Sequence, residues 1–490
     1  MPGFVPIGVQ DLVYRRQPGL CEIDLDSRLH RFRVAGVPFV LDVASGTVAL
    51  LDETAWDVLP YALAGRAVPP DVAGRHGRRA VAEAIEEIGA LARDGLFSSK
   101  DPGDSLAEAL PGPADHAVKA LCLHVAESCN MSCAYCFASG SARRTGGADP
   151  PADPSPRGAG PLMSKSVARS AVDFLFRNSG QRRRVEIDFF GGEPLLNFDV
   201  VREATEYATR LADLNGKTLG LTITTNAALI TPDICEFLNR YRVNAVLSID
   251  GRPAVHDAAR RFLSGAPSYE ACARGAMLLA SSRAGITEPY TYVRGTYTHH
   301  NLDFLQDVLH IVDSGFESVS MEPVVCAEGH PWAIRAEDIP ALCEEYERLA
   351  VEYVRRKRRG RPFRFFHFEI DLSGGPCLSR RLSGCGAGRD YLAVAADGTL
   401  YPCHQFVGAE GFAIGDVENG VTDSALRDEF SRAGVKSKAV CRGCWARYMC
   451  GGGCHAGAYY VNGSIHRPHK IGCELQKKRL ECAMYAQAVG

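Results

Sequence analysis

Three cysteines on one short segment are the residues best suited to chemistry. Cys129, Cys133 and Cys136 are spaced C-x3-C-x2-C and directly follow a run that reads as a β-strand, Lys119–Ala126. Three thiolates on one tight loop can bind three irons of a 4Fe–4S cube, which leaves the fourth iron open to a substrate, whereas a cluster with four cysteines usually only transfers electrons. The alternative is a zinc loop, but zinc prefers four ligands and no fourth partner lies nearby in the sequence.

The C-terminal part of the chain holds a second concentration of cysteines. Residues 377–482 contain nine cysteines, many glycines and few long apolar runs, so we expect this region to need bound metal to fold. Seven of them follow the order C-x12-G-x4-C, then C-x2-C-x5-C-x3-C, then C, with Gly398 as the glycine; they are Cys385, Cys403, Cys441, Cys444, Cys450, Cys454 and Cys473. The C-x2-C spacing alone would also suit a double zinc ribbon.

The elements that must position the first cysteine loop form a repeating pattern. Strand candidates alternate with helical stretches, and six β/α repeats predict a parallel sheet with right-handed crossovers. A complete eight-fold barrel needs about 250 residues and more strands, so we expect an open six-strand barrel. The predicted strands are Lys119–Ala126, Val185–Phe190, Thr218–Thr225, Ala245–Ile249, Pro289–Thr296 and Ser318–Pro323. The predicted helices are Lys165–Asn178, Asp199–Asn215, Pro232–Tyr241, Tyr269–Arg283, Asn301–Ser314 and Ile339–Arg356.

Polar and glycine residues follow successive predicted strands, where ligands bind in such sheets. The candidates are Gly191, Gly192 and Glu193 at the end of the second strand, Thr225 and Asn226 at the end of the third, Ser248 and Asp250 at the end of the fourth, and Arg294 at the end of the fifth. Glycines allow close approach of the backbone to a ligand. Glu193 can pair with an ammonium and Arg294 can clamp a carboxylate.

The cysteine loop, with the aromatic Tyr135 before its third cysteine, resembles the radical S-adenosylmethionine (SAM) superfamily. This resemblance implies that SAM binds the open iron and is cleaved reductively to methionine and a 5′-deoxyadenosyl radical, which removes a hydrogen atom from the substrate. It also implies that the Gly191-Gly192-Glu193 segment receives the amino group of SAM. The SAM-binding residues are then expected to be Tyr135, Gly191, Gly192, Glu193, Thr225, Asn226, Ser248, Asp250 and Arg294.

The seven downstream cysteines resemble the SPASM domain of peptide-modifying radical SAM enzymes, which carries two auxiliary 4Fe–4S clusters. The resemblance implies three clusters in all. It assigns Cys441, Cys444, Cys450 and Cys473 to the distal auxiliary cluster, and Cys385, Cys403 and Cys454 to the proximal one. The fourth position of the proximal cluster is filled either by Cys377 or by a substrate thiolate, and the sequence does not choose.

The first hundred residues read as a small α+β unit. His30–Leu41 predicts a hairpin, Asp52 an N-cap, and Arg78–Asp94 an amphipathic helix. The unit resembles the PqqD-like winged-helix element, which binds a leader peptide as an added strand; the alternative is an unrelated helical cap. The expected domains are 1–102 for this unit, 103–360 for the barrel with a flexible insertion at 139–161, and 361–490 for the SPASM domain.

The whole arrangement is similar to maturases of six-cysteine SCIFF peptides and related thioether-forming enzymes. The segments Leu123–Phe137, Val185–Asp199, Val293–Phe304 and Gly384–Val407 carry this resemblance. It implies that the enzyme joins a cysteine sulfur to a carbon of another residue in a cysteine-rich precursor peptide with a leader, and that an electron donor such as flavodoxin or ferredoxin serves it.

Other functions remain open from the sequence. One is an anaerobic sulfatase-maturase, although those enzymes carry an aspartate where this chain has His404. Others are a maturase that makes a carbon–carbon crosslink or an epimer, and a non-catalytic zinc protein that binds peptides.

Composition limits the location and partners. The net charge of −3 provides no field that attracts nucleic acid or anionic membranes, and no apolar run is long enough to span a bilayer. The start of the chain does not read as a secretory signal, so we expect a cytoplasmic protein. In a reducing compartment, eighteen cysteines indicate metal binding rather than disulfides.

Overall fold

The computed structural model describes residues 28–94, 96–97, 117–139, 160–286, 288–327, 329–372 and 378–490. Cys377 and nearly all of the insertion expected at 139–161 lie outside the described residues. No helix within the described ranges is long and apolar enough to cross a membrane.

A parallel sheet forms the centre of the molecule and confirms the predicted open six-strand arrangement. Consecutive strands of the barrel pair in parallel in the order in which they occur along the chain. They are β4 (Ala120–Ala126), β5 (Arg184–Gly191), β6 (Thr218–Thr225), β7 (Asn244–Ser248), β8 (Thr291–Tyr297) and β9 (Ser318–Pro323). A short strand, β10 (Arg364–Phe365), extends the sheet in parallel beyond β9.

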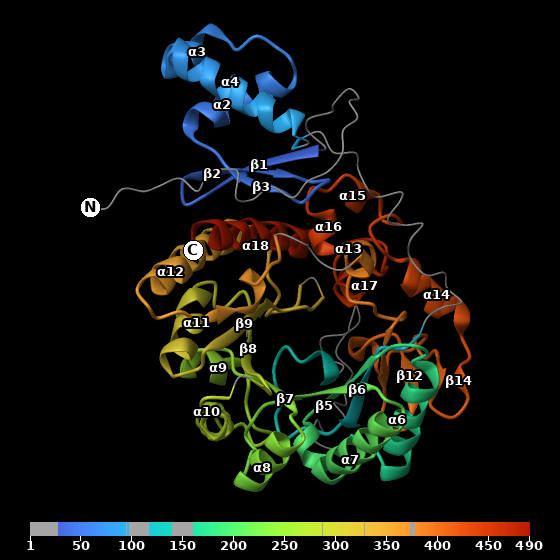
Figure 1. The fold of residues 1–490 in the computed structure, drawn as a ribbon. Coiled ribbons are helices and arrows are strands. Elements are labelled where there is room, and N and C mark those ends of the chain that lie inside the picture. The colour runs from blue at the N-terminus through green and yellow to red at the C-terminus, as the bar shows by residue number, and fades with distance from the viewer. Residues whose placement is uncertain are drawn as a thin grey trace.

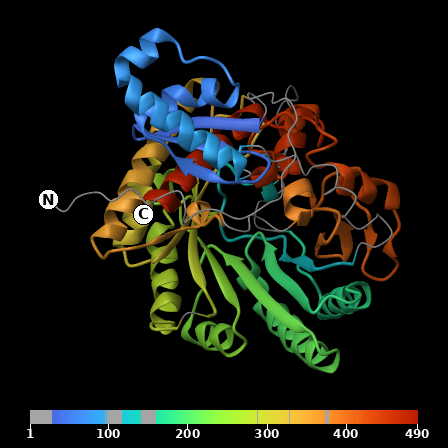
Figure 2. The same cartoon turned by 45° about the horizontal axis from the view of Figure 1, so that its top comes forward.

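Crossover helices cover the outer face of these strands (Figure 2). They match the predicted helices: α6 (Lys165–Asn178), α7 (Phe198–Leu214), α8 (Pro232–Arg240), α10 (Tyr269–Ser282), α11 (Phe304–Asp313) and α12 (Ile339–Arg358). A further short helix, α9 (Pro253–Ala259), was not predicted. On β5, Val185, Ile187 and Phe189 are buried under the helices, and the intervening side chains face the barrel interior because successive residues of a strand alternate.

The C-terminal region is built onto the same sheet. Strand β11 (Tyr391–Val394) pairs in parallel with β4, so that β4 lies between β5 and β11. The sheet continues through β12 (Thr399–Tyr401), β13 (Gly415–Asp416) and β14 (Gly420–Val421) in antiparallel pairing. The strand order is therefore β10-β9-β8-β7-β6-β5-β4-β11-β12-β13-β14. The region expected to depend on metal thus shares backbone pairing with the barrel.

The C-terminal region also contains short helices (Figure 1), and Cys441 and Cys450 lie in two of them. The short helices are α13 (Leu378–Ser383), α14 (Ser424–Arg432), α15 (Ala439–Arg442), α16 (Arg447–Cys450) and α17 (His455–Asn462). The chain ends in a long helix, α18 (Lys470–Val489), which lies along α12 (Figure 1).

Between residues 28 and 94 the N-terminal unit has three antiparallel strands and three helices, in agreement with the predicted α+β pattern. The strands are β1 (Leu29–Val34), β2 (Val37–Asp42) and β3 (Val48–Leu50), in that order in the sheet, and the helices are α2 (Glu53–Leu63), α3 (Pro70–His76) and α4 (Arg78–Arg93). The Asp52 carboxylate accepts a hydrogen bond from the N–H of Ala55 at 2.7 Å and caps α2.

The strands of this unit have two apolar faces because their side chains alternate. Val40 packs with the unit's own helices, whereas Phe32 and Phe39 belong to the main core. The ring of Phe39 meets the edge of Tyr485 on α18, with centroids 6.2 Å apart. His30 stacks on Trp445 at 3.8 Å and hydrogen-bonds Glu481 at 2.8 Å, so the unit is docked on α18 as well as folded on its own core (Figure 1).

We expect the substitution His30→Ala to loosen this docking without unfolding the N-terminal unit. The change removes one ring stacking and one hydrogen bond, together worth about 1–2 kcal/mol, while the core around Val40 and Val58 stays intact. Hydrogen exchange of the β1 amides should accelerate several-fold, with Arg79→Ala on the exposed face of α4 as the control. Unchanged exchange in His30→Ala would show that the contact does not hold the unit in place.

Candidate active site

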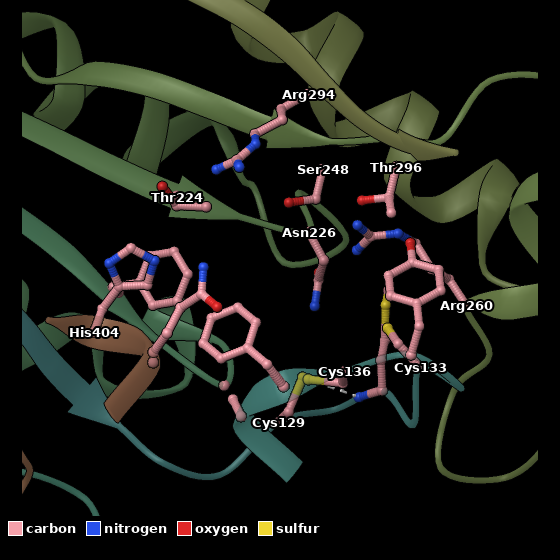
Figure 3. A pocket seen from close by; sticks show the side chains of 18 of the residues that line it. Cys129, Cys133, Cys136, Thr224, Asn226, Ser248, Arg260, Arg294, Thr296 and His404 are labelled. Atoms are coloured by element: carbon pink, nitrogen blue, oxygen red, sulfur yellow. Dashed lines mark hydrogen bonds between the residues drawn. The ribbon is translucent and has the colours of Figure 1, made fainter. Parts of the chain in front are cut away.

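A cavity of about 220 Å³ opens at the C-terminal ends of the barrel strands (Figure 3). Its wall combines the cysteine loop after β4, the ends of β5 to β9 and the turn after β12. Among the predicted SAM-binding residues, the cavity is lined by Tyr135, Gly191, Gly192, Thr225, Asn226, Ser248 and Arg294. Cys129, Cys133 and Cys136 line the same cavity. The structure therefore places the cysteine loop and the ends of distant strands around one space.

The cysteine loop is held by its backbone. The N–H of Ser132 donates to the carbonyl of Arg261 and the N–H of Ala134 donates to the carbonyl of Ala259, each at 2.8 Å, so the end of α9 and the chain just after it support the loop. Burial raises the pKa of the Cys129 and Cys133 thiols to about 12. Cys129 also accepts the N–H of Met131 at 3.4 Å, a type of contact that stabilises a thiolate once iron displaces its proton.

Gly191 and Gly192 allow the end of β5 to pack against the cysteine loop. A Cβ atom on Gly191, whose φ is 134°, would lie 2.1 Å from the carbonyl oxygen of Ala126. One on Gly192 would lie 2.3 Å from the carbonyl oxygen of Ser128. No side chain fits at either position, so these glycines are required by the loop itself, in addition to the access to a ligand expected from the sequence.

Glu193 is fully buried and does not line the cavity. Its carboxylate accepts hydrogen bonds from the N–H of Leu195 at 3.0 Å, the hydroxyl of Thr225 at 2.7 Å and the N–H of Asn226 at 2.8 Å. These contacts tie the end of β5 to the end of β6. The side chain of Asn226 then donates to Asn130 in the cysteine loop at 2.7 Å. Glu193 therefore positions the cavity wall, and its pairing with the SAM ammonium stays a prediction.

Asp250 also lies behind the wall. It accepts hydrogen bonds from the Arg260 guanidinium at 3.0 Å, from the N–H of Thr296 at 2.9 Å and from the Tyr135 hydroxyl. Asp250 and Tyr135 line a neighbouring cavity of about 190 Å³ beside Trp332. Contact between Asp250 and SAM stays a prediction, and the structure gives the residue a role in fixing Tyr135 and Arg260.

Arg260 is a wall residue that sequence reasoning missed. Its guanidinium lies over the ring of Tyr135, 5.6 Å from the centroid, and it lines the cavity next to Cys133 (Figure 3). The residue follows α9, the helix that was not predicted, and its place beside the cysteine loop depends on tertiary contacts with Asp250 and Tyr135.

Glu322 is a second cavity residue that the sequence did not identify. Glu322, at the end of β9, pairs with His367 at 3.1 Å and with Arg479 of α18 at 3.1 Å. Burial opposes its ionisation, but the contacts with His367 and Arg479 hold the pKa of Glu322 well below its usual range. Since Arg479 is far away in the sequence, no local motif identifies this contact.

The turn after Cys403 closes the cavity on its third side. His404 and Gln405 line the wall, and His404 lies beside the rings of Phe137 and Phe190 (Figure 3). The Tyr391 hydroxyl contacts Nδ1 of His404 at 2.7 Å. Burial lowers the pKa of His404 to about 4, so the ring is neutral at pH 7.

The downstream cysteines form two neighbouring sets. The Cys403 thiol lies within electrostatic reach of Cys385 and Cys454. The Cys473 thiol likewise lies near Cys450, Cys441 and Cys444. These are the two groups that the resemblance assigns to the proximal and distal clusters.

The donor sets fit iron–sulfur clusters. Among the described residues, no group of three or more His, Cys, Asp or Glu side chains is arranged to hold a single metal ion. The thiolates of a cubane bind different irons and need only surround the inorganic core. Cys403 and Cys454 also accept backbone N–H groups, at 3.5 Å from Gln405 and 3.4 Å from Gly457. The downstream cysteines therefore suit iron–sulfur clusters. The number of three clusters and the role of Cys377 stay predictions.

Replacement of Glu193 tests its role as a buried link. Burial raises its pKa from 4.5 to about 7, so its contribution to folding is fully present below pH 4.5 and is lost as the pH rises through 7. In cluster-free protein, raising the pH from 4.5 to 8 should lower the unfolding free energy of the wild type by roughly 3 kcal/mol relative to that of Glu193→Gln. Urea unfolding measures it, with Glu83→Gln, an exposed carboxylate, as the control. A difference that does not change with pH would contradict this account.

Comparisons with known proteins match two segments of the chain. Residues 123–271 match the radical SAM superfamily, and residues 385–445 match the iron–sulfur cluster-binding domain SPASM. The uncharacterized protein MJ0907 of Methanocaldococcus jannaschii is 28% identical over 208 residues, which cover 42% of this chain and 62% of that protein. The radical SAM cyclopropyl synthase TigE of Paramaledivibacter caminithermalis is 26% identical over 194 residues, 38% of each protein.

Other matches extend over more of the chain. The serine-type anaerobic sulfatase-maturating enzyme of Klebsiella aerogenes is 23% identical over 346 residues, 68% of this chain and 78% of that protein. The structure of native anSMEcpe with bound AdoMet and Cp18Cys peptide superposes with a TM-score of 0.60 at 18% identity, covering 75% of this chain and 96% of that one, which shows a shared fold. The chain therefore contains a segment that matches the radical SAM superfamily and, C-terminal to it, a segment that matches the SPASM domain.

Proposed function

We propose that this protein is a radical SAM maturase that installs cysteine thioether crosslinks in a ribosomally made precursor peptide. One observation carries the proposal: a single cavity is lined on one side by Cys129, Cys133 and Cys136 and on another by the turn after Cys403. A substrate in this cavity would lie next to both the SAM-cleaving loop and the proximal set of cysteines. Such an arrangement suits a reaction in which a hydrogen atom is abstracted from one residue of the peptide while a cysteine sulfur of the peptide is held close to that residue.

The chain's own residues have distinct tasks in this reaction. Cys129, Cys133 and Cys136 would hold the cluster that, when bound, supplies the electron for SAM cleavage and so the hydrogen-abstracting radical. Ser248 and Asn226 offer hydrogen bonds to the polar groups of SAM from the ends of β7 and β6, and Arg294 offers a guanidinium for its carboxylate (Figure 3).

Apolar residues suit the remaining wall to a reactive carbon radical. The rings of Phe137 and Phe190 stack at 6.1 Å and line the cavity next to His404. They exclude water from the space where the peptide would react, which limits side reactions. His404 is neutral and bonded to Tyr391, so it adds no charge there.

The overall change in the peptide balances without a general base on carbon. For each crosslink the acceptor carbon loses a hydrogen atom, the cysteine thiol loses a proton, and one electron leaves the peptide. A C–S bond replaces one C–H and one S–H bond, so the product is lighter by two hydrogens. Cys385, Cys403 and Cys454 would hold an electron acceptor, and Cys403 directly precedes the cavity residues His404 and Gln405.

The relatives support a peptide or protein as substrate. One is named a sulfatase-maturating enzyme, and the solved structure of the same fold contains a bound peptide. The N-terminal unit adds a possible docking place, because β1 and β3 form the two edges of its sheet within the described residues. An extended leader could pair with such an edge, in the way expected of a PqqD-like unit. A flavodoxin or ferredoxin as electron donor completes the proposal.

The second candidate is oxidation of a cysteine or serine side chain, as in a sulfatase-maturating enzyme. The similarity over 68% of the chain to such an enzyme favours it. His404 argues against it, because it is a neutral ring at the position where the resemblance to sulfatase-maturases implies an aspartate base. The two reactions are distinguished by their products.

Anaerobically reconstituted protein should convert a cysteine-rich peptide with a leader, in the presence of SAM and dithionite. Mass spectrometry should show the loss of two hydrogens and one free thiol for each crosslink, together with 5′-deoxyadenosine. The Cys133→Ala variant is the matched control and should form neither product. A peptide that gains an aldehyde would support the second candidate, and an iron-loaded enzyme that forms no 5′-deoxyadenosine would contradict SAM cleavage.

Arg294→Lys should weaken SAM binding about tenfold, because the ammonium keeps the charge but loses one charge-assisted hydrogen bond, worth roughly 1.5 kcal/mol. Calorimetric titration of reconstituted protein with SAM measures the affinity. Arg240→Lys, on the exposed face of α8, is the control and should bind SAM like the wild type. Equal affinity of Arg294→Lys and wild type would show that Arg294 does not hold the SAM carboxylate.

A further inference from the structure

A buried lysine lies between the two sets of downstream cysteines. Lys438 is 1% exposed and ranks among the largest fully buried side chains of the described residues. Its ammonium donates a hydrogen bond to the carbonyl of Gly452 at 2.8 Å. A lysine is almost never fully buried unless its charge is compensated, so its surroundings need an explanation.

The position of the ammonium is set by the segment that joins the two sets. Gly452 is the middle residue between Cys450 of the distal set and Cys454 of the proximal set. Gly451, Gly452 and Gly453 have φ values of 71°, 99° and 78°, a run of left-handed residues that only glycine adopts readily. Because the carbonyl of Gly452 binds Lys438, the ammonium is fixed at the junction of the two sets.

The neighbours of this ammonium come from both sets. Burial lowers the pKa of Lys438, and the thiols of Cys441 and Cys450 from the distal set and of Cys454 and Cys385 from the proximal set lie near enough to oppose this lowering. The backbone carbonyl of Lys438 also accepts the N–H of Cys441 at 2.9 Å, which joins the residue to the start of α15. No carboxylate pairs with Lys438 in the part of the chain that the structure describes.

Charge balance explains this arrangement. An uncompensated ammonium in the interior costs several kcal/mol, and neutral thiols would not offset that cost. A 4Fe–4S cluster with thiolate ligands carries net negative charge and becomes more negative on reduction. In a low-dielectric interior a fixed positive charge nearby stabilises the reduced state more than the oxidised state.

We propose that Lys438 is a shared electrostatic residue that raises the reduction potentials of both auxiliary clusters. This inference rests on the proposed function, since it takes both sets of cysteines to hold clusters that accept the electron lost by the peptide. Lys438 acts through the clusters and touches no substrate. A higher potential makes each cluster a better electron acceptor.

The test is an anaerobic redox titration followed by electron paramagnetic resonance. It uses the full chain with Cys129, Cys133 and Cys136 changed to Ala, so that only auxiliary clusters contribute to the signal. In this background Lys438→Met removes the charge, Lys438→Gln removes the charge but keeps a donor for Gly452, and Lys438→Arg keeps the charge. Lys436→Met, which removes an exposed charge two residues away, is the matched control.

Both neutral variants should lower both midpoint potentials by at least 59 mV, which is a tenfold change in the equilibrium constant of a one-electron reduction. Lys436→Met should leave both potentials unchanged. Wild-type potentials in Lys438→Gln with full iron content would overturn the proposal, and a shift of one cluster only would overturn the shared role. Loss of iron in both neutral variants but not in Lys438→Arg would support the view that the positive charge at this position balances the clusters. Loss of iron in all three variants would show that the lysine is needed for packing instead, and would overturn the proposal.

This readout is independent of the peptide reaction. If the wild type holds its auxiliary clusters and shows the expected potentials but leaves the peptide unchanged, the proposed function fails and the role of Lys438 stands. If the wild type binds no iron beyond the cluster of the first loop, the premise about the two downstream sets is wrong, and the proposal for Lys438 fails with it.

Discussion

The placement of strand β4 between β5 and β11 is the constraint on which the rest of the site depends. Every residue of β4 is buried, and its two neighbours belong to different parts of the chain. The cysteine loop leaves the end of this strand, so it is fixed between the glycines at the end of β5 and strand β11 of the C-terminal region. The close contact of Gly191 and Gly192 with the backbone before Cys129 leaves the loop little freedom. A cluster and a substrate cavity at this point therefore inherit their geometry from strand pairing.

Much of this arrangement could be predicted from local pattern. Strands and helices alternate in the barrel with strong periodicity, and the cysteine spacings identify the loops that carry them. The polar residues at strand ends were found because parallel strands align their carboxyl ends on one side of a sheet. Seven predicted SAM-binding residues share one cavity for that reason.

The residues that were missed depend on contacts that no local pattern contains. Arg260 reaches the wall from the end of a short helix in a connection, and Arg479 reaches it from α18, across more than a hundred residues. Glu193 and Asp250 were identified as polar residues at the right strand ends, but burial decides their roles. Both carboxylates are satisfied by protein donors, and tertiary packing alone determines which way they face.

Helix α18 links the two ends of the proposed reaction. Its residues Glu481 and Tyr485 contact the N-terminal unit through His30 and Phe39, and Arg479 on the same helix pairs with Glu322 in the cavity wall. A peptide held at the N-terminal unit would thus be tethered to a rigid element that also shapes the site. Tethering raises the effective concentration of the reacting segment as long as the span suits the linker. If a leader peptide binds there, the docking of the N-terminal unit would set which part of the peptide can reach the cavity, and the packing of α18 along α12 would keep that span constant.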